Sequence, residues 1–342
     1  MNTSELKDTS IHITEMAPLQ SEKWNAICNV CSNFFQTTYY DEVNAGFKNK
    51  PVYFQVFKNE VLVAGIKIYT YQSGKPFLKS ISRQAHAFGE PVINCNIENN
   101  DEVLGLLAIE VLKYLNTEGY NYFKSKPVYG GYNLIFDSAI NKKKPISFAC
   151  LSLSNNLDTL WDAIYKTHRR YILKAQKNGL EFAVEDNFDD FYRLLIETYA
   201  GQSIKPPDRR YLYDLYSTAL KYNAAEICFV KDKGEYLSAI MVIKFGKRVE
   251  YMHGGMHRNM LGSGHMIHWH MMMRYKAMGF ETAGFGQVAD ADPDNMKMGT
   301  VSDFKLKFGC SIEPSWQNEV VLHATRYKIY SGFNNIRNIW KK

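Results

Sequence analysis

The chain has 342 residues, of which 46% are hydrophobic and 22% are charged. This composition excludes a disordered chain and predicts a globular protein with room for about two domains. The formal net charge of +6 is mildly basic, so it favours contact with phosphates, nucleotides, tRNA or an anionic membrane surface without selecting one of them.

The apolar runs and the cysteines indicate the compartment. No apolar run approaches the ~20 residues that a membrane-spanning helix needs. Residues 1–13 are polar and charged, without the apolar centre of a signal peptide. Cys28 and Cys31 are close in sequence, but a zinc site would need a second pair of ligands, so we expect buried free thiols. We therefore expect a cytoplasmic protein with reduced cysteines.

In the first half of the chain, a helical region over residues 21–47 precedes a predicted β-hairpin over 52–71. The two hairpin strands are rich in β-branched and aromatic residues, and a polar turn joins them. A second helix is predicted to begin near Asn100, which offers a capping side chain, and to end at Gly119. A short strand follows at 120–123.

The second half repeats this order of elements. Its predicted elements are a helix from Asn156, a helical region over 188–220, a hairpin over 225–245, a strand over 249–253, a helix over 264–278 and a strand over 280–285. Two similar units would account for the length of the chain. We predict two domains, 1–150 and 151–342, the first of which carries an insertion at about 82–99.

Three short motifs of the second half occur in an order that indicates a family. They are Trp161 followed by residues 169–180 (RRYILKAQKNGL), residues 251–255 (YMHGG) and residues 304–309 (FKLKFG). Together they resemble the Fem-type (FemAB-like) transferases of the GNAT superfamily, and residues 88–92 add weaker support. The resemblance implies an α+β fold of tandem GNAT-like domains, each a mixed, mostly antiparallel sheet flanked by helices. It also implies transfer of an acyl or aminoacyl group to an amine, often on a cell-envelope precursor.

The segment that leads into the predicted helix at 264–278 is a candidate donor site. Residues 258–264 (RNMLGSG) resemble the GNAT loop Gln/Arg-x-x-Gly-x-Gly/Ala, although Asn259 stands at the Gln/Arg position. Unpaired N–H groups and the positive dipole end of a helix bind a pyrophosphate such as that of CoA. The candidate cofactor-binding residues are Arg258, Asn259, Gly262, Ser263 and Gly264. A glycine-rich turn that only caps the helix is the alternative.

The resemblance places Lys305 at the acyl-transfer site, because it occupies the lysine of the family's Phe-Lys-x-x-Phe-Gly motif. A cation there stabilises the oxyanion that forms when the amine attacks the carbonyl. A solvated lysine beside Lys307 is the alternative. Two further catalytic candidates are Asp303, as acceptor of the amine proton or as an N-cap, and His253, as a contact of the acceptor or its amine.

One departure from the family concerns an acidic residue on the strand after the predicted helix at 264–278. The family often has Asp-Phe-Gly there, whereas residues 284–286 read Gly-Phe-Gly. We therefore expect the role of this acid to be vacant or to be filled by Glu281, Asp290 or Asp292.

Basic residues on one predicted helix are candidates for binding the acceptor. Lys166, Arg170, Lys174 and Lys177 lie on one stripe of that helix, which suits the phosphates of a nucleotide-linked acceptor or of tRNA. A solvated helix face is the alternative. The candidate substrate-binding residues are Arg170, Lys174 and Tyr251 of the second motif.

Histidines and aromatic residues mark two further segments. Five histidines cluster between residues 253 and 270, but no His-Glu-x-x-His motif or convincing set of Cys or carboxylate partners accompanies them, so we expect helix packing and no metal. The tail, 327–342, mixes aromatic and basic residues. We expect it to dock on the second half of the chain, or else to make peripheral contact with a membrane.

The sequence therefore predicts an N-acyltransferase of cell-envelope biogenesis. Acyl-CoA would be the co-substrate, and the acceptor would be an amine on a polysaccharide or peptidoglycan precursor, either a small molecule or a nucleotide- or lipid-linked glycan. The second half carries the donor motifs, so the first half is expected to shape the acceptor side. One alternative is a Fem-type aminoacyltransferase that uses aminoacyl-tRNA. The other is a non-catalytic module that binds a nucleotide sugar or tRNA.

Overall fold

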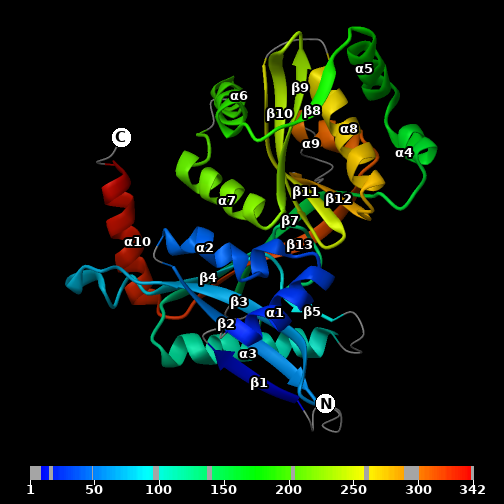
Figure 1. Ribbon diagram of the computed structural model, residues 1–342. Coiled ribbons are helices and arrows are strands. Elements are labelled where there is room, and N and C mark those ends of the chain that lie inside the picture. Colours follow the sequence, from blue (N-terminus) through cyan, green and yellow to red (C-terminus); the bar gives the residue numbers. More distant parts are fainter. Residues whose placement is uncertain are drawn as a thin grey trace. The chain divides into compact units, whose positions relative to one another are not determined.

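The computed structural model describes residues 9–14, 18–47, 49–94, 100–136, 141–201, 205–257, 262–288 and 300–339 (Figure 1). The chain divides into two compact units. Unit 1 consists of Met1–Ile146 and Ser315–Lys342, and unit 2 consists of Ser147–Pro314. The first transition between the units thus lies close to the boundary expected after residue 150.

The C-terminal part of the chain belongs to unit 1, whereas the sequence placed all of 151–342 in one domain. The reason is non-local pairing: β13 (Ser311–Val321) is antiparallel to β6 (Tyr122–Lys126), up to the pair Val321↔Tyr122. Tyr327 of α10 (Ala324–Ile339) then stacks on Tyr122, with ring centroids 4.6 Å apart. The tail therefore docks on unit 1, and the expectation that it docks on the second half is wrong.

Unit 1 is built on a mixed, mostly antiparallel sheet with the strand order β1-β2-β3-β4-β6-β13. The remaining strands are β1 (Thr9–Thr14), β2 (Lys50–Lys58), β3 (Val61–Tyr71), β4 (Gln84–Phe88) and β5 (Val92–Ile93), which pairs with β3. β4 and β6 are parallel to each other. The predicted hairpin at 52–71 is β2–β3, and its turn places Asn59 and Glu60 at positive φ. The expected insertion at 82–99 contains β4 and β5.

Besides α10, the described part of unit 1 contains three further helices. They are α1 (Pro18–Val30), α2 (Tyr39–Ala45) and α3 (Asn100–Thr117). The helical region predicted over 21–47 is thus two helices, separated by a 3₁₀ turn at Phe34–Gln36. α3 follows the predicted periodicity and buries Leu104, Leu107 and Val111 in the same core as the hairpin residues.

In unit 2 the strands of the sheet follow the order β7-β12-β11-β10-β9-β8. Its strands are β7 (Asn141–Ser152), β8 (Glu181–Val184), β9 (Ala225–Asp232), β10 (Glu235–Phe245), β11 (Arg248–Met256) and β12 (Thr282–Val288). Only β11 and β12 run parallel to each other among the pairs of this sheet in the described part of the chain. Each unit thus has the expected mixed, mostly antiparallel sheet.

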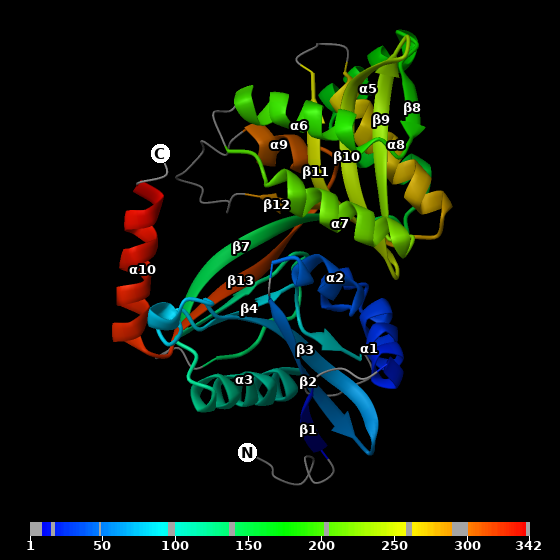
Figure 2. The ribbon, with the colours of Figure 1, turned by 60° about the vertical axis from the view of Figure 1, so that its left-hand side comes forward.

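Helices cover both faces of the unit 2 sheet. They are α4 (Leu157–Ala163), α5 (Lys166–Lys177), α6 (Phe188–Gly201), α7 (Arg209–Lys221), α8 (Ser263–Ala277) and α9 (Thr300–Leu306). Figures 1 and 2 show α6 and α7 on one face and α5 and α8 on the other. Two helices begin at capping side chains: Asn156 accepts a hydrogen bond from the Thr159 N–H, and Asp208 from the Tyr211 N–H.

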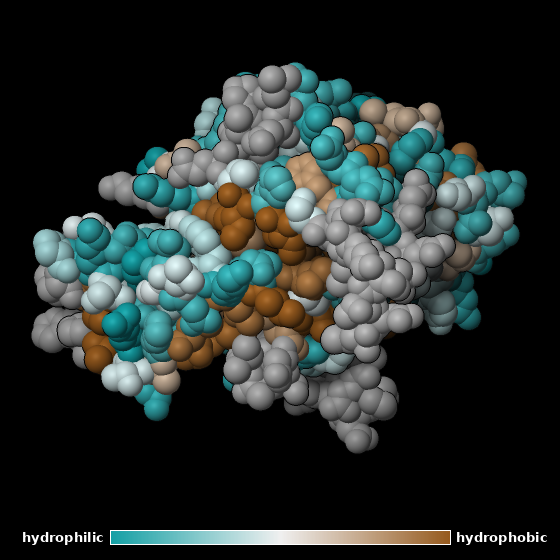
Figure 3. Space-filling view, turned by 90° about the horizontal axis from the view of Figure 1, so that it is seen from below, coloured by the Kyte–Doolittle hydropathy of each residue, from teal (hydrophilic) through white to brown (hydrophobic). Residues whose placement is uncertain are grey.

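Unit 1 exposes several apolar side chains at its surface. Val30, Val61 and Ile109 of unit 1 are each more than half exposed. The space-filling view of Figure 3 shows hydrophobic residues gathered near the middle of one face. No helix among the described residues is both long and apolar enough to cross a membrane. Cys28 and Cys31 are free thiols, as expected, and Cys28 is buried.

Candidate functional site

The parallel pair β11–β12 of unit 2 is short. It joins Arg248–Glu250 of β11 to Thr282–Gly284 of β12. Glu250↔Gly284 is the last pair between these strands in the described part of the chain, although β11 continues to Met256 and β12 to Val288. Beyond this pair the strands no longer satisfy each other's backbone groups, so side chains or a ligand must occupy the space between them.

Gly284 makes room for a carboxylate of the neighbouring strand. A Cβ atom at residue 284 would lie 1.7 Å from Oε2 of Glu250, which is only 2% exposed. The acidic position is therefore not vacant, and Glu281 does not fill it, because Glu281 forms an exposed ion pair with Lys247. Asp290 and Asp292 lie outside the described residues. The structure thus adds Glu250 of β11 as a candidate for this acid, and the roles expected for Asp290 and Asp292 stay predictions.

The Glu250 carboxylate has a rigidly held cationic partner. Arg248, two residues earlier on β11, places its Nε 3.1 Å from Oε2 of Glu250. The guanidinium also donates from Nη2 to the Sγ of Cys150 at 2.9 Å. Burial alone would lower the pKa of Arg248, but the Glu250 charge reverses this and raises it. Arg248 therefore keeps its charge inside unit 2.

Lys305 of α9 brings a second cation to the end of the β11–β12 pairing. Its ammonium donates a hydrogen bond to the Gln287 carbonyl at 2.8 Å and lies 5.7 Å from the ring centroid of Tyr251. Burial lowers the pKa of Lys305 to about 8, while the charge of Glu250 acts in the opposite direction. Lys305 is thus mostly protonated at neutral pH, but it can lose its proton within about one pH unit above neutrality.

An apolar cavity of about 240 Å³ adjoins this lysine in unit 2. It is lined by Thr198, Ser238, Ala239, Ile240, Tyr251, Gly254, Gly255, Met256, Gly264, Ile267, His268, Val301 and Phe304. Gly255 lets α6 approach closely, because a Cβ there would lie 2.3 Å from the backbone of Leu194. A concave apolar space with few polar groups is the usual form of a small-molecule site.

The N-terminus of α8 forms one wall of the cavity. Gly262 caps the helix with φ of +83°, and a Cβ at this position would lie 2.4 Å from the Tyr171 carbonyl oxygen. Gly264 lines the cavity, and Ser263 between them is 2% exposed. Packing therefore requires the glycine at 262, whatever it binds. The first N–H groups of this helix have no intrahelical partners, so they suit an anion.

Comparison with known families decides the class of the protein. A family model described as an acetyltransferase (GNAT) domain matches residues 163–297, which include β10, β11, α8 and β12. Residues 163–297 thus form a GNAT-type domain, and the chain is an acyltransferase. No curated protein sequence matches it.

Solved structures share the fold of this acyltransferase at low sequence identity. FemX has a TM-score of 0.76 with 14% identity, over 93% of this chain and 99% of that chain. The C-terminal DUF2156 domain of a putative lysylphosphatidylglycerol synthetase from Agrobacterium fabrum has a TM-score of 0.55 with 13% identity, over 91% and 94%. A tandem GNAT protein from the clavulanic acid biosynthesis pathway has a TM-score of 0.51 with 11% identity, over 91% and 98%. The chain therefore has the tandem GNAT fold that its sequence predicted.

The acyltransferase brings some of the predicted site residues together and leaves others apart. Lys305, Tyr251 and Gly264 lie at or beside the cavity. Asp303 of α9 is half exposed, and it pairs with Lys307, which follows the end of the helix. His253 is a half-buried residue of β11 that is not among the cavity-lining residues. Arg258 and Asn259 lie outside the described residues.

The predicted basic stripe is a solvent-exposed face of α5. Lys166, Arg170, Lys174 and Lys177 are all exposed, and the opposite face buries Ile172 and other core residues. None of the four lines the cavity of the acyltransferase. Their role in binding a substrate therefore stays a prediction.

The histidines of α8 pack as neutral aromatic rings. His265 stacks on Tyr171, and His268 stacks on Phe285 and Phe308. Burial lowers the pKa of His265 to about 3 and that of His268 to about 4. Since Nδ1 of His268 donates to the Gly264 carbonyl at 2.8 Å, its Nε2 carries no proton. The described residues contain no group of His, Cys, Asp or Glu that could hold a metal ion.

Sequence reasoning missed three functional candidates of the acyltransferase: Glu250, Arg248 and His268. The local signal for the first two was present, because charges at alternate positions of an apolar strand share one face. Whether these charges matter could be judged only together with Gly284, which lies 34 positions after Glu250. His268 was noted only as one of five clustered histidines.

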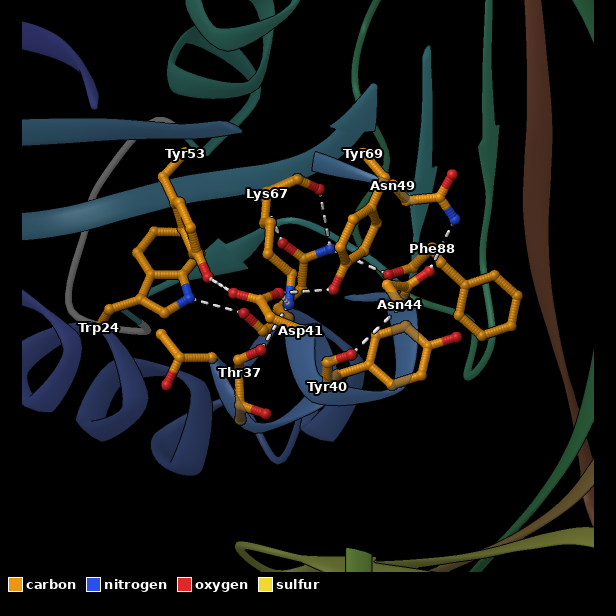
Figure 4. A network of polar contacts seen from close by, with 12 residues as sticks. Trp24, Thr37, Tyr40, Asp41, Asn44, Asn49, Tyr53, Lys67, Tyr69 and Phe88 are labelled. Atoms are coloured by element: carbon orange, nitrogen blue, oxygen red, sulfur yellow. Dashed lines mark hydrogen bonds and ion pairs between the residues drawn. The ribbon is translucent and has the colours of Figure 1, made fainter. Parts of the chain in front are cut away.

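Unit 1 holds another buried cation, Lys67 of β3 (Figure 4). Its side chain is 0% exposed, and its ammonium lies 2.8 Å from Oδ1 of Asp41 and donates to the Thr37 carbonyl. The hydroxyls of Tyr53 and Tyr69 donate to the same carboxylate. Burial lowers the pKa of Lys67, and the Asp41 charge opposes this. This network joins α2 to the β2–β3 hairpin.

Proposed function

We propose that this acyltransferase moves an acyl group from an acyl-CoA thioester to an amine, by direct attack of the amine on the carbonyl. The observation that carries the proposal is the position of the Lys305 ammonium, over the ring of Tyr251, which itself lines the apolar cavity. A space for the acyl group and a cation for the developing oxyanion are thus neighbours. The short β11–β12 pairing leaves room for both.

The start of α8 supports a donor that carries a pyrophosphate. α8 is 15 residues long, and Gly264 in its first turn lines the cavity. Free N–H groups and the helix dipole favour an anion at this end. A pyrophosphate held by the 262–264 turn would let the thioester end of the donor reach the cavity, and Arg258 and Asn259 would assist from the preceding loop.

The reaction then needs no covalent enzyme intermediate. The amine nitrogen attacks the thioester carbonyl, the N–C bond forms, and the C–S bond breaks. Lys305 donates a hydrogen bond to the oxygen that carries the negative charge in between, which lowers the barrier. The proton that the amine loses balances the one that the departing thiolate gains. Lys305 must be protonated for this role, which its pKa of about 8 permits at neutral pH.

For the acceptor, we propose an amine on a cell-envelope or polysaccharide precursor, linked to a nucleotide or a lipid. The exposed stripe on α5, with Arg170 and Lys174, supports phosphate groups on this substrate. Unit 1, which lacks the GNAT-matched residues, would shape the acceptor side, and contact of the tail with a membrane surface would serve a lipid-linked acceptor.

Aminoacyl-tRNA is the second candidate donor. The fold likeness to FemX and the basic stripe of α5 favour it. The fold and α8 are compatible with both donors, so a direct comparison must choose between them.

Thermal unfolding of the full chain with each donor makes that comparison. We expect acetyl-CoA or a longer acyl-CoA to raise the melting temperature, and aminoacyl-tRNA to leave it unchanged, because a ligand stabilises the state it binds. Stabilisation by aminoacyl-tRNA alone would contradict acyl-CoA as the donor and favour aminoacyl-tRNA. A transfer assay with amine acceptors completes the test, since binding of a donor without transfer to any acceptor would support a binding module.

A further inference from the structure

Glu250 is a buried charge in unit 2 that the proposed chemistry does not yet use. It is 2% exposed and stands at the last pair of the parallel strands, opposite Gly284. A buried carboxylate is costly unless cations and hydrogen bonds compensate it. Its position therefore needs a reason beyond packing, because an apolar residue would fill the same space at lower cost.

The glycine opposite is shaped around this carboxylate. A Cβ at residue 284 would lie 1.7 Å from Oε2, 2.3 Å from Cδ and 2.5 Å from Oε1 of Glu250. All three carboxylate atoms thus occupy the side-chain space of residue 284. Position 284 can hold a side chain, or residue 250 can hold its carboxylate, but both cannot be present together.

The next glycine of β12, Gly286, lies close to Lys305. A Cβ at Gly286 would lie 3.5 Å from Nζ of Lys305 and 3.5 Å from the Tyr251 carbonyl oxygen. The carboxylate of Glu250 and the ammonium of Lys305 therefore lie beside glycines that are two residues apart on one strand. The Glu250 charge acts on Lys305 across this short stretch and raises the pKa of the lysine against the effect of burial.

The other charged and titratable groups around Lys305 come from three directions. On β11, Arg248 is bound to Glu250. On α8, His268 is neutral and its own pKa is lowered partly by the Lys305 charge. Cys310 lies after α9, and burial raises its pKa, so it stays a thiol. Asp303 of α9 pairs with Lys307, which follows the helix. Among the described residues, Glu250 is thus the carboxylate of the sheet whose charge raises the pKa of Lys305.

We propose that Glu250 is a positioning residue of the acyltransferase, whose carboxylate lies between the Arg248 guanidinium and the Lys305 ammonium and keeps Lys305 charged beside the cavity. This inference rests on the proposed function only in giving the Lys305 charge a catalytic purpose. Without the carboxylate, Lys305 would share the interior of unit 2 with Arg248 and no anion facing them both. The lysine would then release its proton at lower pH.

The first test measures the protonation of Lys305 without any substrate. The full chain is treated with an amine-reactive reagent over a range of pH, and modification of Lys305 is quantified by peptide mass spectrometry. In Glu250→Gln, which keeps the shape and the amide oxygen for Arg248, we expect the modification midpoint to fall by about 1 pH unit or more. Lys307 of the same chain is the internal control, and its midpoint should stay unchanged. An unshifted Lys305 midpoint in a folded Glu250→Gln variant would overturn the proposal.

The second test moves the carboxylate to the other strand. In the double variant Glu250→Gly/Gly284→Asp, the new side chain starts where the Glu250 carboxylate was, so a negative charge returns to the same space. We expect the Lys305 midpoint of this variant to return toward that of the unchanged protein. Glu250→Asp, which keeps the charge, should also keep the midpoint near the original value, and it serves if Glu250→Gln does not fold. A midpoint in the double variant and in Glu250→Asp as low as in Glu250→Gln would overturn the proposal.

Transfer kinetics separate this inference from the proposed function. If Lys305 acts in its charged form, Glu250→Gln moves the alkaline fall of kcat/KM to lower pH by the same shift as the modification midpoint. A merely structural role for Glu250 would lower kcat/KM at all pH values alike, and that result would count against the proposal. If the midpoint shifts while Lys305→Ala leaves transfer unchanged, the proposed function fails and the pairing of Glu250 with Lys305 stands.

Discussion

Burial lowers the pKa of Lys67 in unit 1 and of Lys305 in unit 2, but the two lysines have very different partners. Lys67 of unit 1 is completely buried and has an ionised partner, Asp41, at 2.8 Å, with the rings of Tyr40, Tyr53 and Tyr69 around it. Lys305 of unit 2 is partly exposed, and within the described residues the Gln287 carbonyl is its one hydrogen-bond acceptor. An ammonium has three donors. Lys305 therefore keeps donors for a ligand, whereas Lys67 is enclosed by its own unit.

The comparison teaches how to separate a structural charge from a functional one. Desolvation opposes both charges, but in unit 1 the protein itself supplies the compensation, and the result is a joint between α2 and the hairpin. In unit 2 the compensation is incomplete beside a cavity. Incomplete compensation costs stability and is retained where an incoming group completes it. The experiments below test this contrast.

The largest effect is expected when Lys67 is removed. Lys67→Met leaves the Asp41 carboxylate in a mostly buried site without its cation, which should lower the free energy of unfolding by about 3 kcal/mol. Chemical denaturation of the full chain measures this. The double variant Lys67→Met/Asp41→Asn should recover part of the loss. Unchanged unfolding of Lys67→Met would mean that the network in unit 1 is not a structural joint.

Removal of Lys305 should lower acyl transfer without lowering the stability of the protein. Lys305→Ala is expected to reduce kcat/KM for acyl transfer about 100-fold, or about 3 kcal/mol in activation free energy, because the oxyanion loses its cation. Its unfolding free energy should stay the same or increase, since an incompletely compensated charge is removed. Lys307→Ala on the same segment is the matched control and should leave transfer unchanged. Equal transfer by both variants would remove Lys305 from the chemistry.

Acidification should weaken unit 2 through the neutral ring of His268, which is 7% exposed. Its pKa is about 4 in the fold and about 6.5 when unfolded, so the unfolded chain binds a proton first as the pH falls. The contribution of the neutral ring to the free energy of unfolding is fully present well above pH 6.5. It declines toward pH 4, by about 1.6 kcal/mol between pH 6.5 and pH 5. Denaturation at both pH values measures the change, and His268→Phe should flatten it. A slope that is identical in this variant would exclude His268 as the cause.

The smallest effect concerns a single donor to the Asp41 carboxylate. Tyr53→Phe keeps the buried ring and removes the hydroxyl that donates to Asp41, so it should lower the free energy of unfolding by about 1.5 kcal/mol. Acyl transfer should be unaffected. Tyr213→Phe is the control, because Tyr213 is 50% exposed and its ring contact survives. A larger loss of transfer than of stability would show that the network of unit 1 also serves the substrate.

Local signals in the sequence were sufficient for most elements near the site. The hairpin predicted at 225–245 is β9–β10, and the helix predicted at 264–278 is α8. Both depend on side-chain periodicity and turn residues, which act over a few positions. The order of three motifs also indicated Lys305 and Tyr251. In the structure the Lys305 ammonium lies 5.7 Å from the ring centroid of Tyr251.

The sequence predictions failed where strands that are far apart in the sequence lie next to each other in the fold. Nothing local in residues 315–342 indicates that β13 pairs with β6, almost 200 positions earlier. Similarly, Gly284 was interpreted as a missing acid, although its lack of a side chain is what admits Glu250. A strand's neighbour and register are decided by the whole sheet, so no window of sequence contains them.

The sequence by itself determined the class of this protein: an α+β chain of two similar halves with GNAT-type motifs in the second half. Periodicity, caps and turns are properties of neighbouring residues, and they survive in any arrangement of the elements. The tertiary structure decided which charges meet. It left Lys67 enclosed and Lys305 partly uncompensated, and it placed Glu250 in the space of Gly284, because burial and strand register exist only after the units have folded.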